Sequence, residues 1–431
     1  MIGRSVGRVV ATRGPLVEAE LPGVRVGDGV RIGGASALGA PARTGVRSRG
    51  TSAVLAARVA GLHGSRALLA PFGAADGIAV GERVEADPDA LALVLGTPLL
   101  GRAIDAAGVP LDGRPAARGR RAGADSVVPA VAERRPCGDV LWTGVRAIDG
   151  PLAFGRGARI GLFGAPGAGK STLLEAVVRG ADADAVVVGL VGERGREAER
   201  WLARLDPRTT LVCATGDRAP AERVRAAEVA FAQADALRAR GLDVLLVLDS
   251  LARVCAAARE IGLAAGEPAG RGGYPPGVFA LLARLLERAG AAGAGSVSLV
   301  ATVLSDGPDE HDPVSEAARA ALDGHLVLSE RLARAGRFPA LDLAKSASRT
   351  LADVAAPDHL RAAQALRAAV AVLEGSRDAR ALGLDPGAGD PFLARCIALE
   401  PELERFLRQE GAPCPPARTL TDLLALADRM G

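Results

Sequence analysis

The sequence predicts an α/β protein in three parts: a small N-terminal β-barrel over residues 1–87, a central core with a mostly parallel sheet over residues 88–349, and a C-terminal helical domain over residues 350–431. Short β-rich runs separated by glycine turns predict the barrel. Short apolar strands that alternate with longer Ala-, Leu- and Arg-rich helices predict a parallel sheet covered by helices on both faces. Strand signals then stop, and helical spacing of the apolar residues predicts the last part.

Individual segments support each part in turn. The barrel runs lie between Val6 and about Glu85, among them GRVVATRGPLVEAEL and SRALLAPF, and the segment from Gly33 to Thr51 is typical of a long barrel loop. In the core, the strands ARIGLFG, AVVVGLVGE and DVLLVLDS are each followed by a helical pattern. The C-terminal runs HLRAAQALRAAVAVLEG and TLTDLLALADRM carry helical spacing.

The composition indicates a globular chain. Of 431 residues, 49% are hydrophobic and 24% are charged, which is enough for buried cores and excludes a disordered or fibrous protein. The net charge of +3 includes no polybasic tail, so we expect no nucleic-acid partner. Lysine occurs only at Lys170 and Lys345, so the chain retains it where an ammonium differs chemically from a guanidinium.

The remaining composition indicates the compartment. The five cysteines are odd in number and lack C-x-x-C spacing, which argues against a disulfide framework or a zinc site. The N-terminus lacks the apolar region of a signal peptide, and no run reaches the ~18 apolar residues that a membrane helix requires. We therefore expect a cytoplasmic protein. The four histidines share no metal spacing, and His325 is predicted to be a structural residue at the start of a strand.

A phosphate-binding loop is predicted at GAPGAGKS, which matches G-x-x-x-x-G-K-[ST] between a strand and a helix. Its glycines let backbone N–H groups surround a phosphate at a helix N-terminus. Lys170 is expected to reach the β and γ phosphates and Ser171 to bind Mg²⁺, so ATP and Mg²⁺ are the predicted cofactors. The predicted nucleotide-binding residues of the loop are Gly164, Ala165, Pro166, Gly167, Ala168, Gly169, Lys170, Ser171 and Thr172.

Carboxylates follow two other apolar strands. Asp249 ends the run DVLLVLD, where a second metal anchor is expected; a helix N-cap is the alternative. Glu193 follows AVVVGLVG and is the candidate base for an attacking water, with Arg194 as a partner that holds it or contacts phosphate. Glu197, one helical turn on, is a candidate to support the metal-bound water. The alternative for this run is a charged, solvated helix start.

Several strings together resemble a known family. These are WTGVRAIDG, GAPGAGKST, VGERGRE, REIGLAAGEP, GYPPGVFALL and KSASR. They resemble the cytoplasmic ATPases of type III secretion systems, of injectisome and flagellar type, which are relatives of the catalytic subunit of rotary ATP synthases. The resemblance covers about Val6 to Gln409. It implies a barrel, a RecA-like ATPase core and a helical C-domain, assembled as a homohexamer.

The resemblance also implies roles for single residues. Glu193 matches the catalytic base and Asp249 the Walker B aspartate. Arg349, in KSASR, matches the arginine that each subunit inserts into its neighbour's site. Phe338, in RFPA, stands where the family usually has a tyrosine that stacks on adenine, and it keeps the aromatic face; a core phenylalanine is the alternative.

The expected function is Mg²⁺-dependent ATP hydrolysis that energises protein secretion through chaperone release and unfolding. The resemblance implies stator, central-stalk and chaperone–substrate partners, and a place at the periphery of the inner membrane. The chain opens almost directly on the barrel, without the extra segment by which relatives contact the stator. Whether the apparatus is an injectisome or a flagellum stays open.

Three alternatives share the same core. A rotary ATP synthase subunit fits the secretion-type strings less well. A hexameric RNA helicase needs barrel aromatics on which bases stack, and residues 1–88 contain one aromatic, Phe72. A non-catalytic nucleotide-binding subunit is expected to lack the carboxylate base, whereas Glu193 is present.

Overall fold

A computed structural model describes residues 5–33, 54–124, 128–165, 167–304 and 312–430. The chain divides into two compact units, each formed by three separated stretches. The first unit contains the barrel together with part of the core, so the units are not the three predicted domains. The first comprises Met1–Val128, Val187–Leu237 and Leu248–Arg288, and the second comprises Pro129–Val186, Arg238–Val247 and Ala289–Gly431.

The N-terminal strands of the first unit form a closed barrel in the order β1-β2-β5-β4-β3-β6, as the sequence predicted. Alternate side chains of these strands fill its interior, including Val17, Val30 and Leu69. The strands are β1 (Val6–Arg13), β2 (Leu16–Glu20), β3 (Gly29–Ile32), β4 (Leu55–His63), β5 (Arg66–Pro71) and β6 (Arg83–Ala86). Apart from Gly33, the predicted barrel loop up to Thr51 lies outside the described residues.

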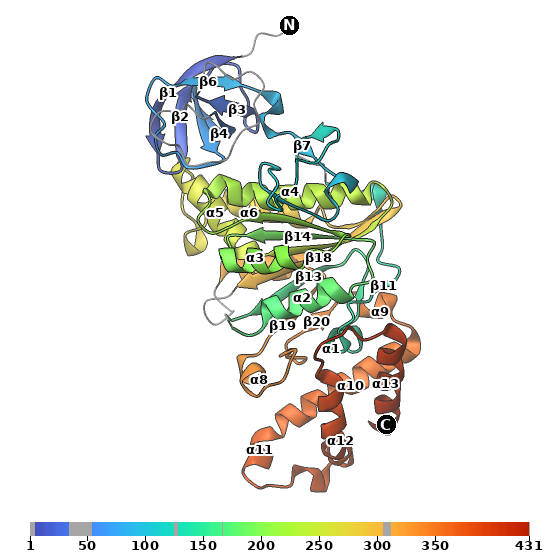
Figure 1. Ribbon diagram of the computed structural model, residues 1–431. Coiled ribbons are helices and arrows are strands. Elements are labelled where there is room, and N and C mark those ends of the chain that lie inside the picture. The colour runs from blue at the N-terminus through green and yellow to red at the C-terminus, as the bar shows by residue number, and fades with distance from the viewer. Residues whose placement is uncertain (1–4, 34–53, 125–127, 166, 305–311, 431) are drawn as a thin grey trace. The chain divides into compact units, whose positions relative to one another are not determined.

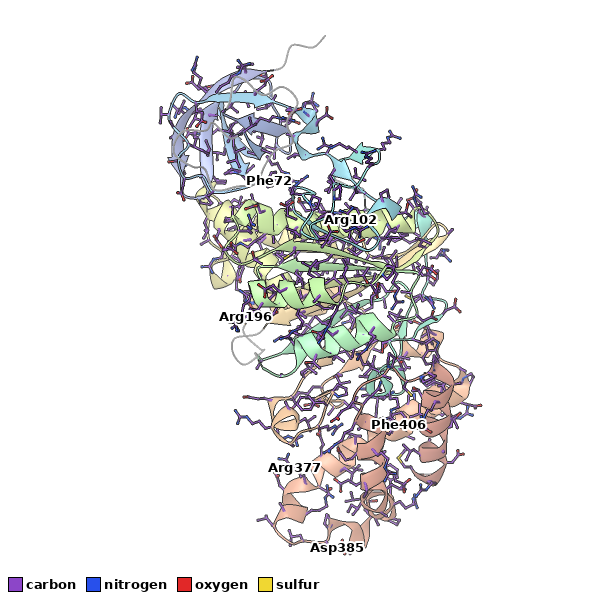
Figure 2. The ribbon with its side chains drawn as sticks, viewed as in Figure 1. Phe72, Arg102, Arg196, Arg377, Asp385 and Phe406 are labelled. Carbon is purple, nitrogen blue, oxygen red and sulfur yellow. The ribbon has the colours of Figure 1, made fainter. Side chains whose placement is uncertain are left out.

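The single aromatic of the barrel region is not available to a nucleic acid. Phe72, labelled in Figure 2, is 5% exposed. It lies under the Arg225 guanidinium, whose carbon is 4.9 Å from the ring centre. Arg225 also donates to the Ala106 and Leu91 carbonyls. Phe72 therefore packs the barrel against its own unit and offers no face on which a base would stack.

The central sheet is mostly parallel, as predicted, with the strand order β20-β19-β13-β18-β16-β14-β15-β8. β13 runs parallel to β18 and β19, and β15 runs parallel to β8, whereas β20 is antiparallel to β19. Every residue of β14 is buried, as expected of a strand in a covered sheet. The strands are β8 (Arg102–Asp105), β13 (Arg159–Gly164), β14 (Ala185–Val191), β15 (Thr209–Ala214), β16 (Asp243–Asp249), β18 (Gly295–Leu304), β19 (Gly324–Val327) and β20 (Ala347–Ser348).

Helices alternate with these strands along the chain. They are α1 (Arg146–Asp149), α2 (Lys170–Gly180), α3 (Gly195–Ala203), α4 (Pro220–Arg238), α5 (Leu251–Ala264), α6 (Pro276–Leu286), α7 (Pro313–Ala321) and α8 (Glu330–Arg334). Short antiparallel pairs, which the sequence did not indicate, add β7 (Leu93–Val94) with β9 (Arg121–Ala122), β11 (Val140–Leu141) with β12 (Phe154–Gly155), and β10 (Arg134–Arg135) with β17 (Gly290–Ala292).

The C-terminal part is helical, as predicted. Helices α10, α12 and α13 contact one another (Figure 1), and their apolar faces bury Leu366, Leu403 and Leu423. The helices are α9 (Leu351–Val354), α10 (Pro357–Gly375), α11 (Arg377–Ala381), α12 (Pro391–Leu407) and α13 (Pro416–Met430). Among the described residues, no helix of the chain has the length and hydropathy that crossing a membrane requires.

Candidate active site

The phosphate loop joins the end of β13 to the start of α2 in the second unit. Gly167 and Gly169 have φ angles of +83° and +96°, in the left-handed region that glycine adopts without strain. These angles turn the chain so that α2 begins at Lys170, with the unpaired N–H groups of its first turn facing the loop. Pro166, one of the predicted binding residues, lies outside the described residues.

The side chains of the loop suit an anion. The Lys170 ammonium donates to the carbonyls of Gly164 and Ala165, so it is folded back over its own loop. Ser171 is half-buried and Thr172 is exposed in the first turn of α2. The loop therefore offers one compact cation, a hydroxyl and backbone donors at a helix N-terminus, which is the combination that binds a phosphate.

Phe338 lies beside this loop. A Cβ placed on Gly169 would be 3.8 Å from the Phe338 ring. The side chain is 39% exposed, whereas its neighbour Arg337 is buried and donates to Glu404. Phe338 is thus not a core residue, and its ring presents an open apolar surface next to the start of α2.

In the first unit, two carboxylates follow the ends of neighbouring strands. Asp249 is the last residue of β16 and is buried. It is not the helix N-cap, because Ser250 fills that position and its hydroxyl accepts from the Arg253 N–H. Ser250 also donates its backbone N–H to the Val191 carbonyl at 3.4 Å, which joins the ends of β14 and β16 and places Glu193 near Asp249.

Glu193 is buried and paired. It is 9% exposed, and its Oε1 accepts a hydrogen bond from Arg253 Nε at 2.9 Å. Burial raises the pKa of Glu193, and the negative charge of Asp249 raises it further; Arg253 opposes this, and Glu197 adds a smaller upward contribution. A carboxylate whose pKa is shifted toward neutrality is suited to accept a proton from water.

Arg253 reaches Glu193 across a glycine. Gly192 has a φ of +72°, and a Cβ there would lie 2.7 Å from Arg253 Cδ. The stem of Arg253 therefore occupies the space that any side chain at position 192 would need. Sequence reasoning assigned no role to Arg253, although it follows Asp249 by four residues and so returns, by one helical turn, to the same strand end.

The other predicted residues near Glu193 lie on α3. Arg194 is at the N-cap position of α3 with an exposed side chain, and among the described residues it is Arg253 that pairs with Glu193. Glu197 is half-buried in the first turn and close enough to influence Glu193. Arg196, beside it, points to solvent (Figure 2).

Arg349 follows β20 in the second unit. Its backbone N–H donates to the Asp323 carbonyl at 2.9 Å, and the pairing of β20 with β19 fixes the strand before it. Its side chain is exposed and makes no ion pair with any described residue. Lys345, four residues earlier, is also exposed.

Comparison with known proteins gives the family. Residues 144–348 match the nucleotide-binding domain of the ATP synthase alpha/beta family. The chain is 40% identical to the type 3 secretion system ATPase of Pseudomonas savastanoi pv. phaseolicola over 99% of this chain and 95% of that protein. It is 43% identical to the flagellum-specific ATP synthase of Pseudomonas aeruginosa over 82% of this chain and 80% of that protein.

This chain belongs to the type III secretion ATPase family. The assembled ATPase EscN from the type III secretion system of enteropathogenic E. coli matches it with a TM-score of 0.88 and 34% identity, over 98% of this chain and all of that one. The resemblance seen in the sequence is confirmed, and the chain is an ATP-hydrolysing enzyme. The ATPase thus carries its phosphate loop in one compact unit and its buried carboxylates in the other.

Proposed function

We propose that this ATPase energises type III protein secretion as a homohexameric ring, in which each subunit completes its neighbour's active site. Arg349 carries the proposal, because its backbone is fixed while its guanidinium is exposed and makes no ion pair among the described residues. An arginine so presented is available to a γ-phosphate bound by the next subunit. Such arginine fingers accelerate hydrolysis by ~10³-fold or more.

The proposed chemistry divides between the two sets of residues. Backbone N–H groups of the loop and Lys170 bind the ATP phosphates, and Phe338 stacks on the adenine. Ser171 and Asp249 supply hard oxygen donors that fit Mg²⁺, which neutralises phosphate charge when bound. Among the described residues, no group of three His, Cys, Asp or Glu side chains could hold a metal ion.

Glu193 is the proposed base. Its carboxylate accepts the proton of the attacking water, while Arg253 holds the carboxylate in place and favours its ionised form. Glu197 would support the metal-bound water, and Arg194, exposed at the N-cap of α3, would contact phosphate. A non-catalytic role is disfavoured, because the base is present and held by a cation.

The relatives support the proposed assembly. The second EscN structure, with a TM-score of 0.86, is of that ATPase in complex with its central stalk EscO. We infer for this chain a ring with a central stalk, stator and chaperone–substrate partners, in the cytoplasm at the periphery of the inner membrane. We also retain the domain boundaries 1–87, 88–349 and 350–431, supported by barrel strands that end at Ala86 and helices that resume at Leu351.

Hydrolysis rates at a series of protein concentrations test the proposal. A wild-type rate that rises more steeply than protein concentration, and is lost in Glu193→Gln and in Arg349→Ala, is expected. Mixing the two variants should restore part of the activity, because some sites then combine an intact base with a neighbour's arginine. A linear wild-type rate that is insensitive to Arg349→Ala would contradict the shared site.

A further inference from the structure

Gln409, in the loop after α12, uses its whole amide to join two segments. Its Nε2 donates to the carbonyls of Gly144 at 2.7 Å and Ala412 at 3.2 Å, and its Oε1 accepts from the Arg146 N–H at 2.9 Å. Its backbone N–H donates to the carbonyl of Phe338 at 2.9 Å. One residue therefore connects the loop before α1 to the aromatic residue beside the phosphate loop.

The loop before α1 in turn rests on the far end of α2. A Cβ placed on Gly144 would lie 3.0 Å from Gly180 Cα, and one on Gly180 would lie 2.5 Å from the Thr143 carbonyl oxygen. These two backbones pass too closely for any side chain between them. Arg179, also in the last turn of α2, donates to the Gly411 carbonyl at 2.7 Å, two residues after Gln409.

These contacts form a continuous chain of residues that connects the two ends of α2. Gly169, the residue just before α2, lies beside the Phe338 ring. The backbone of Phe338 is hydrogen-bonded to Gln409, Gln409 is hydrogen-bonded to Gly144, and Gly144 packs on Gly180 at the last turn of α2. Since α2 is a rigid element that begins at Lys170, its two ends have a fixed separation. Because Gln409 is hydrogen-bonded both to Gly144 and to the Phe338 carbonyl, it fixes the position of the Phe338 backbone relative to α2.

We propose that Gln409 is a positioning residue for nucleotide binding, which sets the distance between the Phe338 ring and the phosphate loop so that the adenine and the phosphates of one ATP are bound together. This proposal rests on the proposed role of Phe338 as the surface on which adenine stacks. If the Phe338 side chain is displaced, the adenine contributes less to ATP binding, while binding of the phosphates is unchanged.

Glutamine is the residue type that the site requires. Its amide presents two donors toward two carbonyls and one acceptor toward one N–H. Gln409→Glu has the same size and still accepts from Arg146, but it turns an oxygen toward the Gly144 and Ala412 carbonyls. Gln409→Ala loses all three bonds.

The experiment compares ATP with inorganic tripolyphosphate, which lacks a base. KM for ATP, kcat, and the inhibition constant of tripolyphosphate are measured for the full chain and for Gln409→Ala, Gln409→Glu, Phe338→Ala and the double variant Gln409→Ala/Phe338→Ala. Gln364→Ala, an exposed glutamine on α10, is the matched control, and the melting temperature of each variant checks its folding.

We expect Phe338→Ala to raise KM about tenfold and both Gln409 variants to raise it about fivefold, with kcat and tripolyphosphate inhibition within twofold of wild type. The KM of the double variant for ATP should not exceed that of Phe338→Ala, because the two residues act through one contact. Gln409 effects that persist in the Phe338→Ala background, or that weaken tripolyphosphate equally, would show a general docking role and overturn the inference. An unchanged KM in Phe338→Ala would instead refute the proposed role of Phe338.

Discussion

The loop from Gly164 to Lys170 presents backbone groups to its ligand, whereas the Glu193 cluster depends on side chains from segments 60 residues apart. The loop is a continuous run whose shape follows from its glycines, and its main side-chain contribution is Lys170. The cluster combines residues at the ends of two strands with the first turn of α5, and burial raises the pKa of its Glu193 carboxylate. Backbone sites depend on which residues allow the turn, while side-chain sites depend on how partners adjust a pKa.

The largest effect is expected at the lysine of the loop. Lys170→Ala should reduce ATP hydrolysis by about 10³-fold, because it removes the loop's compact cation while leaving the helix intact. Lys170→Arg should restore little of the rate, since a planar guanidinium does not replace an ammonium folded over two carbonyls. Steady-state rates of the two variants, with circular dichroism as the folding control, show whether hydrolysis needs only a positive charge at position 170 or also the compact shape of the ammonium. Full activity in Lys170→Arg would mean that only charge matters here.

The proposed base, Glu193, should be nearly as sensitive, with a different signature. Glu193→Gln should lower kcat by about 10²–10⁴-fold and leave ATP affinity close to wild type, because it removes proton acceptance and not phosphate binding. Calorimetric titration with ATP measures the affinity, and Lys170→Ala, which should bind ATP weakly, is the comparison. Equal losses of ATP affinity in both variants would contradict the division in which the loop binds phosphate and Glu193 does not.

Arg253 should change how the rate depends on pH. The base must be ionised, so the rate rises as pH increases through the pKa of Glu193, which burial and Asp249 hold above the ordinary glutamate range. Arg253 lowers that pKa, so Arg253→Met should move the acidic limb of the kcat profile to higher pH and lower kcat about tenfold. Arg196→Met, at an exposed arginine of α3, should leave the limb unchanged. A lower kcat with no shift of the limb would assign Arg253 a purely steric role.

The smallest effect concerns the loop that supports α2. Asp149 is fully buried and accepts from the Thr143 N–H and hydroxyl and from the Gly144 N–H; burial raises its pKa to about 7. The folded chain therefore binds an extra proton between about pH 4 and 7, and the contribution of Asp149 to stability falls as pH rises through that window. Thr143→Val removes a donor to the ionised form, and should destabilise the fold by about 1–3 kcal/mol at pH 8 and less at pH 5.

Thermal unfolding at the two pH values measures this difference. Thr143→Ser keeps the hydroxyl and removes only a buried methyl group, so any loss of stability should be the same at both pH values. A Thr143→Val loss of equal size at pH 5 and pH 8 would mean that the lost acceptor for the Val145 N–H, and not the charge of Asp149, accounts for the effect.

Much of the fold and part of the site were predictable from the sequence, for reasons that particular residues make clear. The phosphate loop is local, and Asp249 and Glu193 follow long apolar runs, so strand ends could be located by pattern alone. The barrel was predictable from its short runs and turns. Ser250 as the N-cap was missed, because either of two adjacent polar residues satisfies the pattern, and only the hydrogen bond from the Arg253 N–H to the Ser250 hydroxyl distinguishes them.

Tertiary partners were not predictable. Glu193 pairs with Arg253 across 60 residues, and adjacency in sequence favoured Arg194 instead. Gln409 connects to Gly144 across 265 residues, and nothing in the run FLRQEG indicates an amide with three backbone partners. In a chain this rich in arginine, composition gives no means of separating the guanidinium that pairs with Glu193 from those that pair with other carboxylates or face solvent.

The exposure of Lys345 makes the chain an unusually selective target for amine-directed labelling. Besides the N-terminal amine there are only two primary amines, and Lys170 is engaged by its own loop. The ammonium of Lys345 makes no such contact with any residue that the structure describes, and it lies just before β20, four residues before Arg349. A fluorophore attached there would sense the surroundings of Arg349, the arginine proposed to reach the neighbouring subunit, and would be expected to record ring assembly by optical means with no residue replaced.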